Sequence, residues 1–326
     1  MPRAVAALLA LAGALAGPAC RRGRTPAEEV ASGPAAGSSA APPDGFLAAP
    51  VVDSHVHLVY WPVADRLAAA GIAAAVDLAA PIDAIGSEQP ITVLWAGPML
   101  TRPGGYPIDA WDPGGFGAGC DARPCVDEAV ETAAARGARV IKIAFGDDGL
   151  APELARAAVE DAHRHGLPVA AHALTDDAAR AAADAGCDLL AHTPVTPLSD
   201  ATVAAWSKRA VISTLAAFGG GPDAVDNLRR LRAAGATVLY GTDLGNSRVA
   251  GVDPDELKLL GEAGLDGPAI VDAMTTTPVR YWKLEGLAGD PPGPEGSYVV
   301  LARDPRQDPT AYVTPVAVYL RGRLLR

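Results

Sequence analysis

Six residues of types that can bind metal stand where apolar, strand-like runs of this chain end. They are His55, His57, Lys142, His172, His192 and Asp243. The chain has only 6 histidines and four lysines in 326 residues, so most of its histidines and one of its few lysines occupy matching positions. A parallel barrel collects the carboxyl ends of its strands on one face, where such proteins carry out chemistry. We therefore expect these side chains to converge on one metal site.

The local sequences support this interpretation. Residues 51–58, VVDSHVHL, alternate so that His55 and His57 project from one side of a strand and can reach one ion. Lys142 lies within the apolar run VIKIA, where an unpaired ammonium would be costly to bury. Asp53 shares the histidines' side, either to support a ligand or as a polar strand start. His172, His192 and Asp243 each close a short apolar run that turn residues follow.

Composition narrows the class of protein. With 49% hydrophobic residues and 35 glycines, the chain can bury a core large enough for one barrel-sized domain with a small appendage. A net charge of -11 argues against nucleic acid and against broad adhesion to anionic lipid, so a small-molecule substrate is expected. Arginine far outnumbers lysine. Lys142 is therefore an exception, since only an amine forms a carbamate or shifts its pKa readily.

The first 48 residues are predicted to lie outside that domain. Residues 1–19 have the basic start and short apolar stretch of a secretory signal peptide. Cys20 comes next and suggests a bacterial lipoprotein whose thiol carries lipid, with ordinary secretion as the alternative. Residues 20–48 are predicted to be a flexible tether. The protein is thus expected in the cell envelope or periplasm, attached to the membrane only through a lipid anchor.

Export changes how the other cysteines are interpreted. Cys120 and Cys125 flank a short polar loop and can close a disulfide in an oxidising compartment. A zinc knuckle is the rival interpretation, but a second pair of cysteines is missing from the sequence. We therefore favour the disulfide.

From residue 49 the chain alternates strand-like and helix-like stretches, as βα units do. The strand-like runs cover residues 51–57, 72–77, 91–97, 139–145, 168–173, 188–192, 210–215 and 237–243. Helical stretches are predicted at residues 126–136, 152–165, 176–185, 200–208, 223–234 and 255–263. Because the ligand-type residues come from several strands, the pattern favours an α/β fold with a closed (β/α)8 TIM-like barrel over an open sheet. The barrel is placed at 49–285, and residues 286–326 are predicted to form strands of a small, reduced β-sandwich.

The order His-x-His, Lys, His, His, Asp resembles the amidohydrolase superfamily, more narrowly its imidazolonepropionase-like and prolidase-like branch. The motifs that carry the resemblance are Val140-Ile141-Lys142-Ile143, Val169-Ala170-Ala171-His172-Ala173, Ala191-His192-Thr193-Pro194, Ser213-Thr214-Leu215 and Gly241-Thr242-Asp243. The resemblance implies two divalent metal ions, usually zinc. It assigns His55, His57 and Asp243 to one ion and His172 and His192 to the other, with Lys142 carboxylated and bridging the pair.

The function that this resemblance implies is hydrolysis of an amide-type C–N bond, non-peptide or in a dipeptide, by metal-bound hydroxide. Asp243 would serve as the general acid and base. A carbamate would also turn the buried cation of Lys142 into an anion that binds both metals. Lactone or phosphotriester hydrolysis on the same site is an alternative. A metal-binding envelope lipoprotein without catalysis is an alternative of another class.

Two segments bear on the substrate. Residues 101–125 form a long Gly/Pro-rich stretch that is predicted to be a lid, in which Tyr106 and Trp111 either line a pocket or pack the loop. Arg248 follows the last strand and either binds a substrate carboxylate or faces solvent. His163 and His165 repeat the His-x-His spacing at the end of a predicted helix, where they do not share a face, so both are expected outside the site.

Overall fold

The computed structural model describes residues 44–111, 114–287 and 296–326. The predicted signal peptide (1–19), Cys20 and most of the predicted tether (20–48) therefore lie outside the described residues. Within the described ranges, no helix has the length and apolar character needed to cross a membrane.

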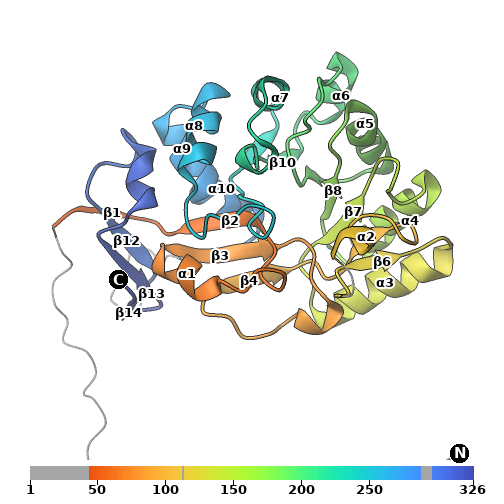
Figure 1. Cartoon of the computed structure of the whole chain (residues 1–326), viewed down its shortest axis with the longest axis horizontal. Helices are drawn as coiled ribbons and strands as arrows, with labels where there is room; N and C mark the ends of the chain where they lie inside the picture. Colours follow the sequence, from red (N-terminus) through yellow and green to blue (C-terminus); the bar gives the residue numbers. More distant parts are fainter. Residues whose placement is uncertain (1–43, 112–113, 288–295) are drawn as a thin grey trace, which may run out of the picture. The chain divides into compact units, whose positions relative to one another are not determined.

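Parallel strands form two sheets at the centre of the fold (Figure 1). β2 (Val51–Val56), β3 (Ile72–Asp77) and β4 (Thr92–Trp95) make a three-stranded sheet in that order. The second sheet has seven strands in the order β11-β10-β9-β8-β7-β5-β6. Their bounds are β5 (Met99–Thr101), β6 (Gly117–Gly119), β7 (Ile141–Ala144), β8 (Val169–His172), β9 (Leu189–Leu190), β10 (Ala210–Ile212) and β11 (Thr237–Leu239). The predicted α/β class with parallel strands is confirmed.

Backbone hydrogen bonds link the two sheets at both sides. Ser54 N–H of β2 donates to the carbonyl of Tyr240, just after β11, at 2.9 Å. Arg139 N–H, just before β7, donates to the carbonyl of Trp95 in β4, also at 2.9 Å. The strands are buried on both faces, which explains why their sequences read as continuous apolar runs rather than as alternating ones.

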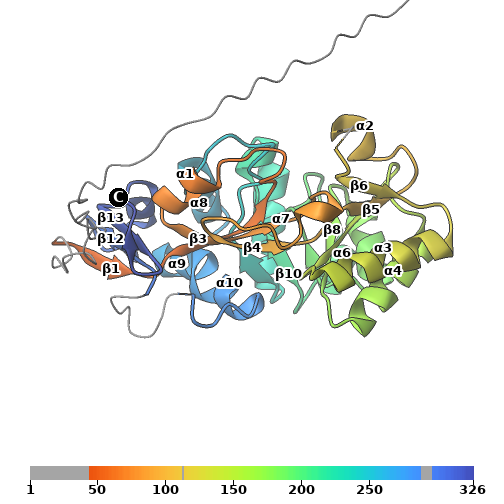
Figure 2. The same ribbon diagram turned by 90° about the horizontal axis from the view of Figure 1, so that it is seen from below.

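Helices follow most of the strands and cover the sheets, as the two views show (Figures 1 and 2). Thr175 and Ser199 cap the starts of α5 and α6 by accepting backbone N–H bonds, and the left-handed Gly137 and Gly186 end α3 and α5. The helices are α1 (Ala64–Ala69), α2 (Ile108–Trp111), α3 (Arg123–Arg136), α4 (Pro152–Arg164), α5 (Asp176–Ala185), α6 (Asp200–Ala205), α7 (Pro222–Ala233), α8 (Pro254–Glu262), α9 (Gly267–Met274) and α10 (Thr276–Tyr281). The short helix η2 (Ala216–Phe218) lies between β10 and α7.

Buried side chains of both sheets pack together between the strands. The cluster includes Val52, Ala74, Val140, Ala170 and Leu239, and Trp282 after α10 packs against it. The Trp282 indole N–H donates to Ser54 Oγ at 3.1 Å, so this large side chain is fixed beside β2. The packing holds β2 in register with its neighbours, and β2 carries the first His-x-His motif.

A small antiparallel sheet has the order β1-β12-β13-β14, with β1 before the parallel strands in the chain and the other three strands after them. Its strands are β1 (Phe46–Ala48), β12 (Tyr298–Leu301), β13 (Ala317–Leu320) and β14 (Arg323–Leu324). The prediction of a tether up to residue 48 is wrong at its end, because Phe46–Ala48 pair with β12 and satisfy backbone groups that an edge strand would leave open. One such sheet is present among the described residues, and three of its four strands come from residues 286–326, which are predicted to form strands of a reduced β-sandwich.

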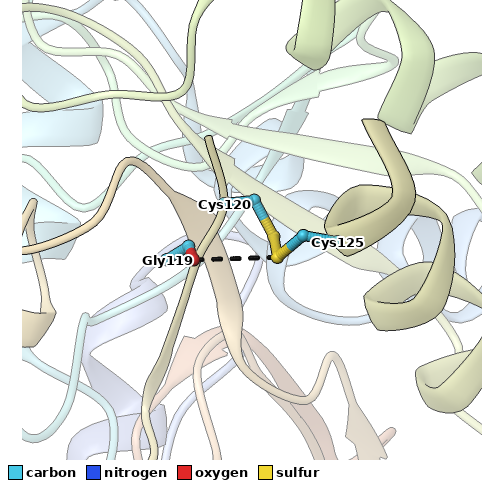
Figure 3. The surroundings of a disulfide bond; sticks show 3 residues. All are labelled: Gly119, Cys120 and Cys125. Carbon is cyan, nitrogen blue, oxygen red and sulfur yellow. Dashed lines mark hydrogen bonds between the residues drawn. A yellow bond between two sulfur atoms is a disulfide. The ribbon is translucent and has the colours of Figure 1, made fainter. Parts of the chain in front are cut away.

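The stretch predicted to be an unstructured lid has more structure than expected. β5 and β6 pair in parallel, with Leu100 opposite Ala118, and the short α2 lies between them. A disulfide joins Cys120, just after β6, to Cys125 in the first turn of α3, with their Cα atoms 5.5 Å apart (Figure 3). Cys125 Sγ also contacts the Gly119 carbonyl oxygen at 3.7 Å. The small residues of Gly117–Gly119 lack the branched and aromatic side chains that signal a strand, which explains why β6 is hard to predict.

Candidate metal centre

Five of the six ligand-type residues lie at or just beyond the carboxyl ends of parallel strands, and Lys142 lies within its strand. His55 belongs to β2 and His57 follows it directly, while Lys142 lies in β7. His172 is the last residue of β8, His192 follows β9, and Asp243 follows β11. Five of them are at most 2% exposed, and His172 is partly buried. Polar groups of this kind are buried only where they have partners.

The ligand atoms of three of these residues converge on one point. His55 Nε2 and His57 Nε2 are 3.2 Å apart, and Asp243 Oδ1 lies 3.1 Å from His57 Nε2 and 3.4 Å from His55 Nε2. Two imidazole nitrogens and a carboxylate oxygen at such distances form a group able to hold a metal ion. The residues present therefore fit a divalent metal ion.

A backbone carbonyl identifies the tautomer of His55. His55 Nδ1 lies 2.8 Å from the carbonyl oxygen of Ala191. A carbonyl oxygen only accepts, so Nδ1 carries the hydrogen and Nε2 presents its lone pair to the centre. This is the orientation that a metal-binding histidine requires.

Lys142 and the other two histidines adjoin this group. Lys142 Nζ lies 3.0 Å from His55 Nε2. The ring centroid of His192 is 4.5 Å from that of His55 and 4.9 Å from that of His172. His192 Nδ1 is hydrogen-bonded to Thr214 Oγ1, at 3.1 Å, and His172 Nδ1 is a buried atom without a hydrogen-bond partner among the described residues. All six predicted residues are therefore neighbours in one buried cluster.

The electrostatics of the cluster favour the protonation states that bind metal. Burial lowers the pKa of His172 to about 3 and holds the pKa values of His55 and His192 well below the ordinary value, with the charge of Lys142 adding to the effect. Burial alone would raise the pKa of Asp243, but His55, His57 and Lys142 together hold it below its usual range. Burial also lowers the pKa of Lys142 to about 8. Neutral imidazoles and an ionised carboxylate are ready to bind a cation at neutral pH.

Two residues outside the ligand set hold Asp243 in place: Asn246, which the sequence pattern does not single out, and Asp53, which it offers as a possible support for a ligand. Asn246 Nδ2 donates to both carboxylate oxygens of Asp243, at 3.2 and 3.1 Å. Asp53 accepts from the Thr242 hydroxyl at 2.6 Å and from its N–H at 3.1 Å, which ties β2 to the segment that carries Asp243. Asp243 itself has a φ of 52°, an uncommon value outside glycine. The signal available in the sequence is the polar turn directly after Asp243, although its interactions become visible only in the structure.

The aromatic residues predicted to contact substrate lie against ligand imidazoles. Tyr106 stacks on His172 with ring centroids 4.7 Å apart, and Trp111 meets His57 edge-on at the same distance. Arg248 is exposed, and its guanidinium carbon lies 4.2 Å from the centroid of the Trp61 ring. Tyr106 and Trp111 thus adjoin the centre, whereas Arg248 packs on a neighbouring tryptophan.

His163 of the second His-x-His motif has a different partner. Its Nε2 lies 2.9 Å from Asp188 Oδ2, and both side chains are partly exposed. Asp188 precedes β9 and also accepts the N–H of Val169 at the start of β8. This pair therefore belongs to the amino ends of the strands, opposite the metal centre.

Comparison with known proteins shows which solved structures share this fold. No family model matches the sequence. An uncharacterised protein of Mycobacterium tuberculosis is 28% identical over 284 residues, which cover 76% of this chain and 73% of that protein. Among solved structures, an amidohydrolase matches with a TM-score of 0.70 at 20% identity over 86% of each chain. A Xaa-Pro dipeptidase with methionine bound in its active site matches with a TM-score of 0.69 at 18% identity, covering 84% of this chain and 85% of that chain.

The chain therefore shares its fold with solved amidohydrolase and prolidase structures. The resemblance predicted from the order of the ligand residues is confirmed at the level of the fold.

Proposed function

We propose that this protein is a metal-dependent hydrolase of the amidohydrolase superfamily that cleaves an amide-type C–N bond in a small molecule. The observation that carries the proposal is the buried convergence of His55, His57 and Asp243 at the carboxyl ends of parallel strands. The fold shared with an amidohydrolase and a dipeptidase supports the same class. We also propose that the two parallel sheets close into a TIM-like barrel, a view supported by the hydrogen bonds from Ser54 to Tyr240 and from Arg139 to Trp95.

The proposed centre holds two divalent ions, with zinc as the expected metal. His55, His57 and Asp243 would hold one ion, His172 and His192 would hold the other, and a carboxylated Lys142 would serve as a ligand to both. A pKa of about 8 for Lys142 supports the carbamate, because far more of this amine is unprotonated at neutral pH than of an ordinary lysine. The neutral amine attacks carbon dioxide, an N–C bond forms, and one proton leaves to solvent.

The metal ions and the side chains around the centre have different roles in the proposed hydrolysis. When bound, the metal ions acidify the attacking water and polarise the substrate carbonyl. Asp243 takes a proton from the water at its carboxylate and delivers it to the leaving nitrogen. The two hydrogen bonds from Asn246 keep that carboxylate in one orientation, and burial of the centre excludes bulk water.

The substrate is proposed to combine an apolar group with a carboxylate, as a dipeptide or an N-acyl amino acid does. Tyr106 and Trp111 offer aromatic faces beside the ligand histidines. Arg248 has no ion-pair partner among the described residues, so its planar guanidinium is available to bind a carboxylate with two hydrogen bonds. The Trp61 ring packs against the guanidinium and holds it in place. The dipeptidase with bound methionine supports a ligand of amino-acid size.

The test joins metal analysis to a substrate panel. Purified zinc-loaded protein and its Asp243→Asn variant are assayed on dipeptides, N-acyl amino acids, hydantoin-like rings, lactones and phosphotriesters, with metal content measured by mass spectrometry. We expect two ions per chain, hydrolysis of at least one amide, and a loss of about 10²- to 10⁴-fold in the variant because general acid–base catalysis is removed.

The other outcomes are equally informative. Unchanged hydrolysis by Asp243→Asn with its metal retained overturns the mechanism. Exclusive hydrolysis of lactones or phosphotriesters overturns the assignment to C–N bonds. Bound metal without hydrolysis of any substrate in the panel supports the metal-binding envelope protein instead.

Export and lipidation at Cys20 are proposed from the sequence alone. The mature chain is expected to begin at Cys20 and to carry lipid there. Mass spectrometry of the N-terminal peptide from membrane fractions tests this, with Cys20→Ser as the variant that cannot be lipidated. A mature N-terminus at another residue would contradict it.

A further inference from the structure

Asp77, the last residue of β3, is a buried carboxylate that the proposed mechanism does not use. Its side chain is 0% exposed. Asp77 Oδ2 accepts the N–H of Leu58 at 2.7 Å, and Oδ1 accepts the N–H of Ala79 at 3.2 Å. No arginine or lysine pairs with it among the described residues, and the one ionisable side chain that approaches its carboxylate within 4 Å is His57, whose Nδ1 lies 3.9 Å from Oδ1.

The two nitrogens of the His57 ring have different surroundings. Nε2 faces His55 and Asp243 in the ligand group. Nδ1 is buried and has no hydrogen-bond partner in the described part of the chain. A metal-binding histidine commonly donates its other ring N–H to a carboxylate, which fixes the tautomer and the orientation of the ring. Asp77 is the carboxylate on that side of the ring.

The backbone explains why Asp77 is well placed for this role. β2 and β3 pair in parallel, with Val56 opposite Asp77, so the strand that leads into His57 lies beside the strand that ends in the carboxylate. The bonds from Leu58 and Ala79 fix both carboxylate oxygens. A separation of 3.9 Å exceeds a direct hydrogen bond, and the terminal torsion of a histidine side chain is soft enough for a small rotation of the ring to change it.

We propose that Asp77 is a positioning residue for His57. It accepts the Nδ1–H of the ring, selects the tautomer with a free lone pair on Nε2, and so strengthens metal binding at His55, His57 and Asp243. Asp77 contacts neither substrate nor ion and acts through His57. The proposal rests on the metal site of the proposed function and is independent of the bond that is hydrolysed.

A double-mutant cycle on zinc affinity tests the proposal. Zinc affinity is measured by competition with a chelator for the full chain, for Asp77→Asn, for His57→Gln and for the double variant. We expect Asp77→Asn to weaken binding by about 10- to 100-fold when His57 is present and to have no further effect when His57 is glutamine. An equal loss in both backgrounds would mean that Asp77 only braces the backbone at Leu58 and Ala79, and would overturn the proposal.

Asp53→Asn is the matched control, because Asp53 is another fully buried carboxylate beside the cluster. Its bonds go to Thr242 and to the His55 N–H, and none reaches an imidazole nitrogen. Its effect on zinc affinity is therefore expected to persist in the His57→Gln background. An effect that vanishes there, as for Asp77→Asn, would show that the cycle does not report on the imidazole and would overturn the assignment.

A spectroscopic measurement covers the case in which Asp77→Asn does not fold. In zinc-loaded protein with ¹⁵N-labelled histidine, the Nδ1 of His57 should carry a slowly exchanging proton, assigned by its loss in His57→Gln. A His57 ring without a proton on Nδ1 overturns the proposal, and no Asp77 variant is needed.

Failure of this inference is distinguishable from failure of the proposed function. Protein that binds zinc with the predicted cycle but hydrolyses nothing overturns the function and leaves Asp77 as a positioning residue. Protein that hydrolyses an amide while Asp77→Asn binds zinc normally overturns only the inference. Protein that binds no zinc overturns both.

Discussion

The chain carries the sequence His-x-His twice, in places with opposite outcomes. His55 and His57 end a strand, where a spacing of two residues returns to the same face. His163 and His165 end α4, where two residues correspond to a turn of about 200° around the helix axis. The first pair brings two Nε2 atoms to 3.2 Å, whereas His163 pairs with Asp188. The element that carries the motif decides its chemistry, and the spacing alone does not.

Burial separates the two motifs as clearly as geometry does. His55 and His57 are 0% and 1% exposed, and the His163 side chain is 44% exposed. A buried imidazole favours protein partners for its nitrogens: the Ala191 carbonyl lies 2.8 Å from His55 Nδ1 and Asp243 Oδ1 lies 3.1 Å from His57 Nε2, whereas Asp77 Oδ1 is 3.9 Å from His57 Nδ1. An exposed imidazole has water for the same purpose. Burial is therefore what makes the strand motif a ligand group rather than a surface feature.

The largest difference is expected between variants that change one histidine in each motif. His55→Gln should remove the ion held by His55, His57 and Asp243 and abolish hydrolysis, because glutamine does not replace the Nε2 lone pair between its neighbours. His163→Gln should change stability by no more than about 0.5 kcal/mol, as expected for a surface site, and leave metal content unchanged. Metal analysis and activity of both variants check this. Similar losses in both would show that the contrast between the motifs has no functional meaning.

Lys142 extends the contrast from histidines to cations. Arg164, between His163 and His165, is exposed and pairs with Asp161, whereas Lys142 is buried beside His55. Lys142→Arg keeps the charge but cannot form a carbamate, so metal content should fall from two ions to one or none. Arg164→Lys is the control and should leave two. Labelling with ¹³C-bicarbonate should give a carbamate signal in wild type alone, and a carbamate signal that survives Lys142→Arg would contradict the assignment.

The sequence predicts best the features whose signals recur along the chain, namely the apolar strand-like runs and the helix caps. Apolar runs and helix caps predicted α4 at 152–165, where the helix is Pro152–Arg164, and placed every ligand-type residue near a strand end. β1 was missed because its partner, β12, is distant in sequence, and a short strand in a Pro/Ala/Gly-rich stretch has no local signal. The partners of Asp77 and Asn246 also depend on tertiary neighbours. A sequence shows which residues are available, whereas their hydrogen bonds arise only from packing.

Acid should destabilise the metal-free protein through the buried histidines. His172 has a folded-state pKa of about 3 against an ordinary 6.5, so the unfolded chain binds more protons between these pH values. Its contribution to the free energy of unfolding is full above pH 6.5 and falls as pH drops toward 3, by up to about 1.4 kcal/mol per pH unit. His172→Gln should make the free energy of unfolding depend less steeply on pH, because the contribution of this one histidine is removed. Denaturant unfolding at pH 7 and pH 5 measures it, and identical slopes in both proteins would refute the prediction.

The smallest effect is expected at the exposed pair His163–Asp188. Exposed pairs of this kind contribute little because water competes for both partners, so the coupling energy in a double-mutant cycle of His163→Gln and Asp188→Asn should be about 0.2–0.5 kcal/mol. Asp188→Asn alone should cost more than His163→Gln alone, because Asp188 also accepts the N–H of Val169 at 2.8 Å. Thermal unfolding of the single and double variants tests this. A coupling of several kcal/mol would mean that water does not screen the amino ends of the strands, and that exposure does not separate the two motifs.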